Sequence, residues 1–284
     1  MAMVIRDVRE MRQTAERLRA SGKRIAVVPT MGFLHEGHLS LIRIARQKAD
    51  AVITTLFVNP AQFGPNEDFA RYPRAFERDL ALADSAGTDY LFAPDASQMY
   101  PTGYSTYVQV EGITEVLEGK SRPGHFRGVA TVVAKLFNLT KPHIAVFGQK
   151  DAQQVAVIRR MVRDLNFDVE LIIAPIVRES DGLAMSSRNT YLTASQRKEA
   201  VCLHQALKLA EQRVKQGVRE CESIRQEMKK LITTTSSGQV DYISIADNNS
   251  LQELERLHPR QSVLVSLAVR FGTTRLIDNV VLLV

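Results

Sequence analysis

The chain has no tryptophan, only two cysteines and few aromatic residues, and each scarcity excludes a class of protein. Its 284 residues include 11 Phe and 7 Tyr, so aromatic side chains make up 6% of the total. Nucleic-acid-binding modules usually combine a basic stripe with stacking aromatic side chains, and this composition argues against such a surface. Cys202 and Cys221 lack metal-ligand spacing. That excludes a cysteine-based metal motif and favours reduced thiols.

Long apolar runs are also missing. No stretch is long enough to span a bilayer, and residues 1–5 lead at once into charged sequence instead of the apolar core of a signal peptide. We therefore expect a cytoplasmic protein with no membrane partner. The composition is otherwise ordinary for a globular protein, at 45% hydrophobic and 24% charged.

The chain is moderately basic, with a net charge of +6 and a pI near 9.4. Such a balance suits either nucleic acid or a pocket for small anions. Lys and Arg are spread along the sequence, and no basic block stands free. A small anionic ligand is therefore favoured, and no nucleic-acid partner is expected.

Apolar runs alternate with amphipathic stretches through the first two-thirds of the chain. Strands are expected at 25–28, 51–58, 90–92, 144–147 and 171–176, and helices at 39–49, 75–86, 129–139 and 154–165. This alternation predicts an α/β fold with a doubly wound parallel sheet, whose ligands bind beyond the carboxyl ends of the strands.

The pattern changes near residue 177. Helices are expected at about 194–216 and 220–232, followed by strands at 242–245, 263–269 and 274–283. Helices followed by hairpin-like strands predict a smaller α+β domain. We place the two domains at residues 1–177 and 178–284.

The most informative string is PTMGFLHEGH at residues 29–38, which carries His35 and His38. A strand, a glycine turn and a helix in this order bring both imidazoles to a helix N-terminus, where backbone N–H groups and the helix dipole attract phosphate. Two imidazole donors there would stabilise the charge that develops on a pentacoordinate phosphorus. The alternative is two ordinary histidines. This string resembles the His-x-Gly-His element of nucleotidyltransferases that attack the α-phosphate of ATP, and the resemblance predicts adenylation or nucleotidyl transfer.

Two further strings suit phosphate binding. In FGQKDAQQ, residues 147–154, Lys150 offers a point charge and Gln154 an amide for a second substrate, although simple helix capping is the alternative. In GLAMSSRN, residues 182–189, hydroxyl groups and one Arg suit a triphosphate, and a flexible linker is the alternative.

Two other strings suit different ligands or roles. In FVNPAQF, residues 57–63, Asn59 and Gln62 are neutral amides that suit hydroxyls and a carboxylate, and a structural turn is the alternative. In RPGHFRG, residues 122–128, two Arg and one His form a positive lip that either belongs to an anion pocket or starts a helix.

Together these strings resemble the pantoate–β-alanine ligase family across essentially the whole chain. The matching segments are 29–38, 57–63, 72–74, 122–128, 147–154, 185–189 and 276–279. The resemblance implies a Rossmann-like nucleotidyltransferase domain, a smaller C-terminal domain and a homodimer. It also implies that ATP, pantoate and β-alanine give pantothenate, AMP and diphosphate, with Mg²⁺. The chemistry requires a pantoyl adenylate, which is labile to water, so we expect the C-terminal domain to close as a lid.

The resemblance also assigns residue roles. His38 takes the proton-donor role, with His35 beside it. From the chemistry of the first step we also expect His35, His38, Lys150 and Arg188 to balance the triphosphate charge. Gln62 and Gln154 resemble pantoate ligands, with Asn59 beside them, and Gln62 would also meet β-alanine. The implied ATP contacts are Met31, Gly32, Phe33, Leu34, His35, Glu36, Gly37, His38, Gly148, Gln149, Lys150, Asp151, Val177, Met185, Ser186, Ser187 and Arg188. Gln149 and Ala152 depart from the family's usual Glu and aromatic residue.

Two alternatives differ in function. A cytidylyl- or adenylyltransferase that stops at nucleotidyl transfer would need a pocket for a phosphorylated acceptor, whereas Asn59, Gln62 and Gln154 offer neutral amides. A nucleic-acid-binding module is suggested by the basic pI and by the His-x-Gly-His element of tRNA synthetases, but the aromatic side chains that it would use are scarce.

Overall fold

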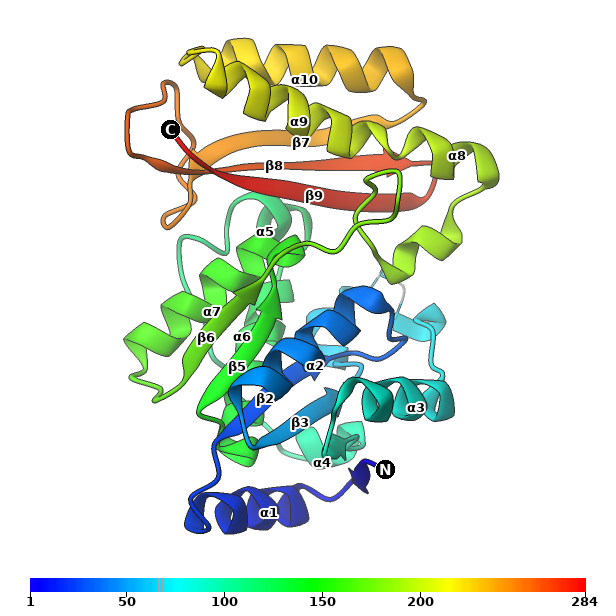
Figure 1. Ribbon diagram of the computed structural model, residues 1–284, viewed down its shortest axis with the longest axis vertical. Helices are drawn as coiled ribbons and strands as arrows, with labels where there is room; N and C mark the ends of the chain where they lie inside the picture. The colour runs from blue at the N-terminus through cyan, green and yellow to red at the C-terminus, as the bar shows by residue number, and fades with distance from the viewer. Residues whose placement is uncertain (66, 68) are drawn as a thin grey trace. The chain divides into compact units, whose positions relative to one another are not determined.

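The computed structural model describes residues 1–65, 67 and 69–284, which form two compact units (Figure 1). The first unit comprises Met1–Gly148 and Val157–Pro175, and the second comprises Gln149–Ala156 and Ile176–Val284. Each unit has its own sheet and is described by itself.

A six-stranded parallel sheet in the order β1-β4-β3-β2-β5-β6 forms the centre of the first unit. Its strands are β1 (Met3–Ile5), β2 (Ile25–Thr30), β3 (Ala51–Leu56), β4 (Tyr90–Phe92), β5 (Ile144–Gly148) and β6 (Glu170–Ala174). From β2 the chain winds outward through β3 to β4, then crosses to β5 and β6 on the other side of β2. The predicted doubly wound sheet is confirmed, and its switch point lies between β2 and β5.

Helices cover both faces of this sheet (Figure 1). They are α1 (Val8–Ala20), α2 (Glu36–Lys48), α3 (Phe76–Ala86), α4 (Ala96–Met99), α5 (Leu117–Ser121), α6 (His125–Thr140) and α7 (Ala152–Asp164). Contacts join α2 to α3 and α1 to α6, and right-handed crossovers place these two pairs on opposite faces. No helix in the described part of the chain is both long and apolar enough to cross a membrane.

The core on one face of the sheet shows why these segments fold as they do. Leu39, Ile42 and Ala45 recur at helical spacing along α2 and are buried against Val28 of β2 and Val146 of β5. Both faces of these central strands are covered, so they read as nearly continuous apolar runs. This packing fixes the carboxyl end of β2 and the start of α2, where the predicted histidines lie.

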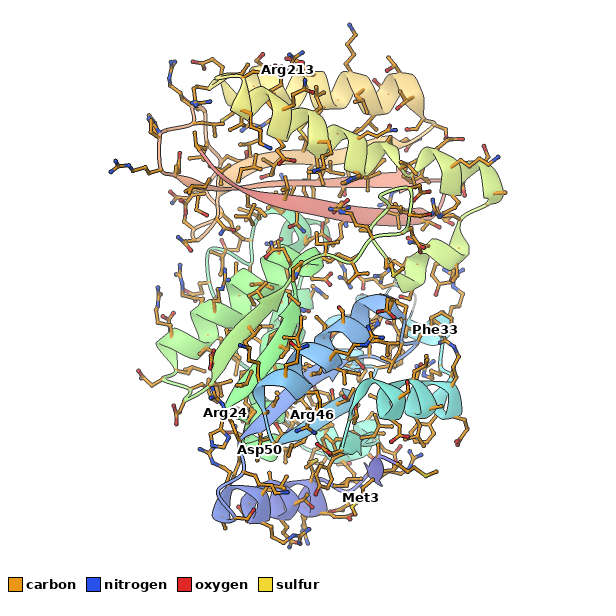
Figure 2. The ribbon with its side chains drawn as sticks, in the orientation of Figure 1. Met3, Arg24, Phe33, Arg46, Asp50 and Arg213 are labelled. Atoms are coloured by element: carbon orange, nitrogen blue, oxygen red, sulfur yellow. The ribbon has the colours of Figure 1, made fainter. Side chains whose placement is uncertain are left out.

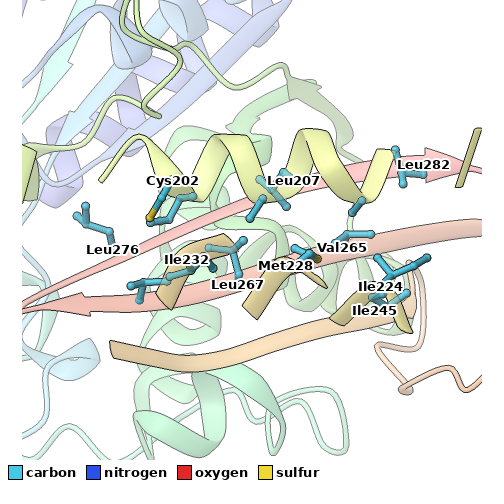
Figure 3. Packing of buried hydrophobic residues seen from close by; sticks show 14 of the residues in the cluster. Cys202, Leu207, Ile224, Met228, Ile232, Ile245, Val265, Leu267, Leu276 and Leu282 are labelled. Atoms are coloured by element: carbon cyan, nitrogen blue, oxygen red, sulfur yellow. The ribbon is translucent and has the colours of Figure 1, made fainter. Parts of the chain in front are cut away.

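The second unit is a three-stranded antiparallel sheet with helices packed on it, which confirms the predicted α+β class (Figure 3). Its elements are α8 (Ala194–Glu199), α9 (Cys202–Lys215), α10 (Cys221–Thr235), β7 (Gln239–Asp247), β8 (Ser262–Phe271) and β9 (Thr274–Leu283). Leu207, Met228 and Ile232 from the helices share a buried cluster with Val265 and Leu267 of β8. The single helix expected at 194–216 is in fact two, α8 and α9.

The two compact units differ in two respects from the division expected between residues 177 and 178. The second unit resumes at Ile176, two residues before the expected boundary. Gln149–Ala156 belongs to the second unit. The reason is a contact to β9, because the Asn279 side chain donates to the backbone carbonyls of Gln149 at 3.0 Å and Lys150 at 2.9 Å. No single cut of the sequence separates the units as the structure forms them.

Candidate active site

The turn between β2 and α2 carries the first part of the site. Thr30 closes β2, and its Oγ1 accepts the Gly32 N–H at 3.2 Å while it donates to the Thr55 carbonyl at 2.6 Å. Gly32 and Phe33 then adopt left-handed conformations, with φ of +87° and +51°; Figure 2 labels Phe33. A Cβ on Gly32 would lie 3.1 Å from Asp79 Oδ2, so conformation and space both favour glycine there.

Asp79, in the first turn of α3, anchors this turn, a role that was not predicted from the sequence. The residue is 2% exposed, and its two carboxylate oxygens accept the N–H groups of Phe33 at 2.7 Å and Leu34 at 2.8 Å. These two backbone donors of the turn therefore already have a protein acceptor. The phosphate binding predicted for the start of the helix stays a prediction. An acidic residue early in a helix is common, so no feature of the sequence signals this role.

His35 and His38 form a reciprocal cap at the N-terminus of α2. His35 is the N-cap, its Nδ1 accepts the Gly37 N–H at 3.2 Å, and His38 Nδ1 accepts the His35 N–H at 3.3 Å. The ring centroids are 4.1 Å apart. A neutral imidazole that accepts at Nδ1 carries its proton on Nε2. The cap thus makes Nε2–H the donor of both rings.

Two other predicted ATP contacts in this segment have roles of their own. Leu34 is fully buried and its N–H donates to Asp79, so the ATP contact predicted for it stays a prediction. Glu36 forms an ion pair with Arg43 on the same helix, and this hydrogen bond lowers the pKa of the Glu36 carboxyl. The Glu36 charge is therefore balanced locally.

Asn59 and Gln62 lie beyond the carboxyl end of β3, around the short 3₁₀ helix η1 (Pro60–Gln62). Asn59 is 1% exposed. Its amide donates to the Gly128 carbonyl at 3.1 Å and to Gln62 Oε1 at 3.2 Å, and its oxygen accepts the Tyr100 hydroxyl at 2.8 Å. Gln62 Nε2 donates to the sulfur of Met31 at 2.9 Å. Asn59 therefore orients Gln62, and the substrate contact predicted for each stays a prediction.

His125 and Arg122 hold the backbone of Gln62. Arg122 pairs bidentately with Glu67, at 2.7 and 2.6 Å, and its guanidinium lies 3.0 Å from His125 Nε2. His125 Nδ1 lies 2.8 Å from the Gln62 carbonyl and is the donor in that bond. Burial and the nearby Arg122 charge lower the pKa of His125 to about 4. His125 is thus neutral at pH 7, and the expected positive lip is partly neutralised by Glu67.

This buried histidine predicts acid sensitivity of the first unit. The folded-state pKa of His125, about 4, lies below the ordinary value of 6.5, so the unfolded chain binds more protons between these pH values. The contribution of His125 to stability is complete above pH 6.5 and is lost as the pH falls towards 4. It amounts to at most about 3 kcal/mol.

Urea unfolding at pH 7.0 and pH 4.5 measures this effect. In the His125→Asn variant an amide nitrogen takes the place of Nδ1 and retains the donor to Gln62, but the titrating ring is gone. We expect a smaller loss of stability between the two pH values than in the parent chain. An unchanged difference would assign the acid sensitivity to other groups.

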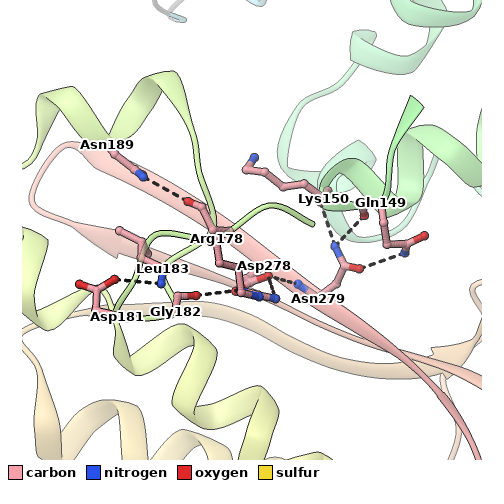
Figure 4. Close-up of polar contacts among 10 residues, drawn as sticks. Gln149, Lys150, Arg178, Asp181, Gly182, Leu183, Asn189, Asp278 and Asn279 are labelled. Atoms are coloured by element: carbon pink, nitrogen blue, oxygen red, sulfur yellow. Dashed lines mark hydrogen bonds and ion pairs between the residues drawn. The ribbon is translucent and has the colours of Figure 1, made fainter. Parts of the chain in front are cut away.

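In the second unit, the first of the predicted ATP contacts lie on the 3₁₀ turn η3 (Gln149–Asp151), which precedes α7. The Lys150 side chain is 21% exposed, and its Nζ lies 3.9 Å from the Asp151 carboxylate. Figure 4 shows the Lys150 side chain extending away from the turn that carries it. Gln154, one helical turn further on, is half-buried. The turn therefore presents a cation at a helix start, as the sequence predicted.

Residues 177–189 form a hydrogen-bonded hairpin and a 3₁₀ turn. The Met185 N–H donates to the Val177 carbonyl at 3.0 Å, and Arg178 and Ala184 form a β-bridge. Ser186 then caps the 3₁₀ helix η4 (Ser187–Tyr191), since its hydroxyl accepts the Arg188 N–H at 3.3 Å. This regular structure argues against the flexible linker considered above.

Among residues 1–65, 67 and 69–284, no three His, Cys, Asp or Glu side chains cluster so that they could hold a metal ion. Mg²⁺ is usually bound by one or two carboxylates together with substrate phosphates and water, not by a cage of protein ligands.

The doubly wound sheet and the histidine cap at the end of β2 define an α/β protein of the His-x-Gly-His nucleotidyltransferase class. Within this class, the chain belongs to the pantoate–β-alanine ligase family, whose model matches residues 3–281. The family and the ligase activity predicted from the sequence are confirmed.

Individual relatives agree along the whole chain. Pantothenate synthetases from Moorella thermoacetica and Acetivibrio thermocellus are 58% and 55% identical over 279 and 278 residues, which is 98% of each chain. The crystal structure of pantothenate synthetase from Thermus thermophilus matches with a TM-score of 0.91 and 46% identity over 98% of both chains. The pantoate-β-alanine ligase of Francisella tularensis, complexed with β-γ ATP and β-alanine, matches with a TM-score of 0.81 and 33% identity over 99% of this chain and 97% of that one.

Proposed function

We propose that this chain makes pantothenate from pantoate and β-alanine through a pantoyl adenylate, with ATP as co-substrate. The observation that carries this proposal is the histidine cap with its neighbour Gln62. Nδ1 of His35 and of His38 each accepts a backbone N–H, which leaves Nε2–H as the donor of each ring, and Met31, in the turn that leads to them, contacts the amide of Gln62. The turn after β2 thus supplies imidazole donors for a phosphate. The neighbouring turn after β3 supplies a neutral amide for a carboxylate or a hydroxyl.

The first step is attack by a pantoate carboxylate oxygen on the α-phosphorus of ATP. Diphosphate leaves, and the carboxyl group becomes a mixed anhydride with AMP. We assign His38 and His35 to the developing charge on the phosphate oxygens, with Lys150 and Arg188 as the further cations that balance the triphosphate. The remaining ATP contacts implied by the family resemblance belong to the same proposal.

In the second step the free amine of β-alanine attacks the acyl carbon, and AMP leaves with the bridging oxygen. A carboxylate alone cannot react in this way because its leaving group would be oxide. No covalent enzyme intermediate is required, and the Ser186 hydroxyl is occupied as a helix cap. Gln62 and Gln154 are proposed to hold pantoate, and Gln62 also to meet β-alanine.

Three further proposals rest on the family resemblance or the sequence. Mg²⁺ is proposed to enter with ATP, and the enzyme to act as a homodimer in the cytoplasm. Size-exclusion chromatography with light scattering tests the dimer, and titration of activity against Mg²⁺ and EDTA tests the metal requirement.

The decisive test of the reaction is product analysis. The protein is incubated with ATP, Mg²⁺ and pantoate, with and without β-alanine, while diphosphate and AMP are measured separately. We expect AMP release to require β-alanine. Diphosphate without amine-dependent AMP release would instead indicate an enzyme that stops at nucleotidyl transfer.

The Gln62→Ala substitution tests the substrate side of the site. Removing the amide should raise the KM for pantoate by at least about 10-fold, the lower end of what a hydrogen bond to a charged group contributes. The KM for ATP should stay nearly unchanged. Gln226→Ala, which removes an amide from the exposed surface of α10, is the control. Equal losses for ATP and pantoate would contradict the assignment.

A further inference from the structure

The segment 276–279, Leu-Ile-Asp-Asn, matches the family but has no role in the reaction described above. It lies on β9, where Asp278 and Asn279 are 2% and 3% exposed. Two adjacent polar residues buried in a strand are costly unless their hydrogen-bonding groups are satisfied. Both are satisfied, and their partners lie in the two segments of the second unit that are proposed to contact ATP (Figure 4).

Asn279 holds the turn that carries Lys150. Its side-chain amide donates to two consecutive backbone carbonyls, of Gln149 at 3.0 Å and of Lys150 at 2.9 Å. Its side-chain oxygen accepts from Gln149 Nε2 at 3.0 Å. Only an amide offers two donors and an acceptor on one short planar group. An aspartate of the same shape would turn both donors into acceptors facing carbonyl oxygens.

Asp278 holds the hairpin that leads to Met185–Arg188. Its carboxylate pairs bidentately with Arg178 at 2.6 and 3.0 Å, and it also accepts the Asn279 N–H at 2.8 Å. Arg178 in turn donates to the Gly182 carbonyl at 3.1 Å. The pair is well shielded, since the carboxylate is 1% exposed and the guanidinium 21%. One strand therefore fixes the backbone of both segments.

We propose that Asn279 is a positioning residue for ATP, which sets Lys150 through the carbonyls of its turn, while Asp278 fixes the hairpin before Met185–Arg188. The inference rests on the proposed function, because it takes Lys150 as an ATP contact. Asn279 does not itself touch the nucleotide. A displacement of about 1 Å in a charged group can lower a rate by about 100-fold, so the backbone anchor of Lys150 has consequences for turnover.

A double-mutant cycle between Asn279 and Lys150 tests the proposal. We measure kcat/KM for ATP, at saturating pantoate and β-alanine, in Asn279→Ala, Lys150→Ala and the double variant. We expect Lys150→Ala to lose about 100-fold and Asn279→Ala about 10-fold. Since Asn279 acts through Lys150, the double variant should fall within about 3-fold of Lys150→Ala, whereas independent effects would multiply to about 1000-fold.

Two further variants separate positioning from loss of structure. Asn279→Asp keeps the shape and the acceptor but places a carboxylate oxygen against the two carbonyls, so it should lose at least as much kcat/KM for ATP as Asn279→Ala. Val265→Ala, in the buried cluster of the same unit, should lower the melting temperature without changing kcat/KM for ATP (Figure 3). A kinetic loss in Val265→Ala as large as that in Asn279→Ala would overturn the proposal.

The outcomes also distinguish this inference from the proposed function. If Lys150→Ala leaves kcat/KM for ATP unchanged, the assignment of Lys150 to ATP fails. If Lys150→Ala is impaired but Asn279→Ala is not, or if the two losses multiply, the assignment stands and the positioning role of Asn279 is wrong.

Discussion

Replacing His38 by alanine is expected to lower kcat for pantothenate formation by about 10²- to 10³-fold, the usual cost of removing one donor to a transition-state charge. The Kd for ATP should change much less. The physical reason is that the His38 Nε2–H meets an oxygen whose charge grows only as the α-phosphorus becomes pentacoordinate. Steady-state kinetics together with equilibrium titration of ATP in the absence of pantoate measure the two effects separately.

Two other variants at this position separate the chemistry from the cap. His38→Asn can still accept the His35 N–H, as Nδ1 does, but has no group at the position of Nε2. His38→Gln places an amide N–H near Nε2 but loses the cap acceptor. If Nε2–H is the catalytic donor, the kcat of His38→Asn should resemble that of His38→Ala. The kcat of His38→Gln should be higher than both. The opposite order would show that the cap, worth about 1 kcal/mol of stability, is the dominant role of His38.

The fold was predictable where the amino-acid pattern has one physical explanation. The apolar runs at 25–28 and 144–147 are buried on both faces, and the observed strands extend them by only two residues and one residue. The three-residue strand β1 was not predicted, because three residues are too few to show the alternation or apolar run that indicates a strand. The break between α8 and α9 was also missed, since Ala200 and Val201 continue the helical periodicity across it.

The site was predictable only for side chains whose own chemistry points to a ligand. His35, His38, Lys150 and Arg188 carry donors or charges in recognisable strings, but their roles in catalysis remain proposals. Asp79 and the partners of Asn279 could not be found in this way, because their function depends on backbone groups 45 and about 130 residues away in the chain. Sequence spacing says nothing about such pairings. The structure also added a contact that was not expected, since the N–H groups of Phe33 and Leu34 donate to Asp79.

Replacing Asp79 by alanine is expected to have the largest effect on the stability of the turn before His35. The substitution leaves the N–H groups of Phe33 and Leu34 without their acceptors in a buried site, at a cost of about 1–3 kcal/mol for each group that stays unsatisfied. The left-handed residues Gly32 and Phe33 then lose the contact that holds them. We expect kcat to fall by at least about 10-fold, because the turn sets where His35 begins the helix.

Asp79→Asn and Leu91→Ala provide the matched comparison. Asparagine keeps the shape and one acceptor, so its losses of stability and of kcat should both be smaller than those of alanine. Leu91 lies on β4, is fully buried in the same core and has an apolar side chain that cannot hydrogen-bond to the turn, and its truncation should cost about 2–5 kcal/mol. Urea unfolding gives the free energies, and kcat is measured at a temperature where every variant is folded. If Leu91→Ala, at equal or greater loss of stability, lowers kcat as much as Asp79→Ala does, then Asp79 contributes only to folding and not to the placement of His35 and His38.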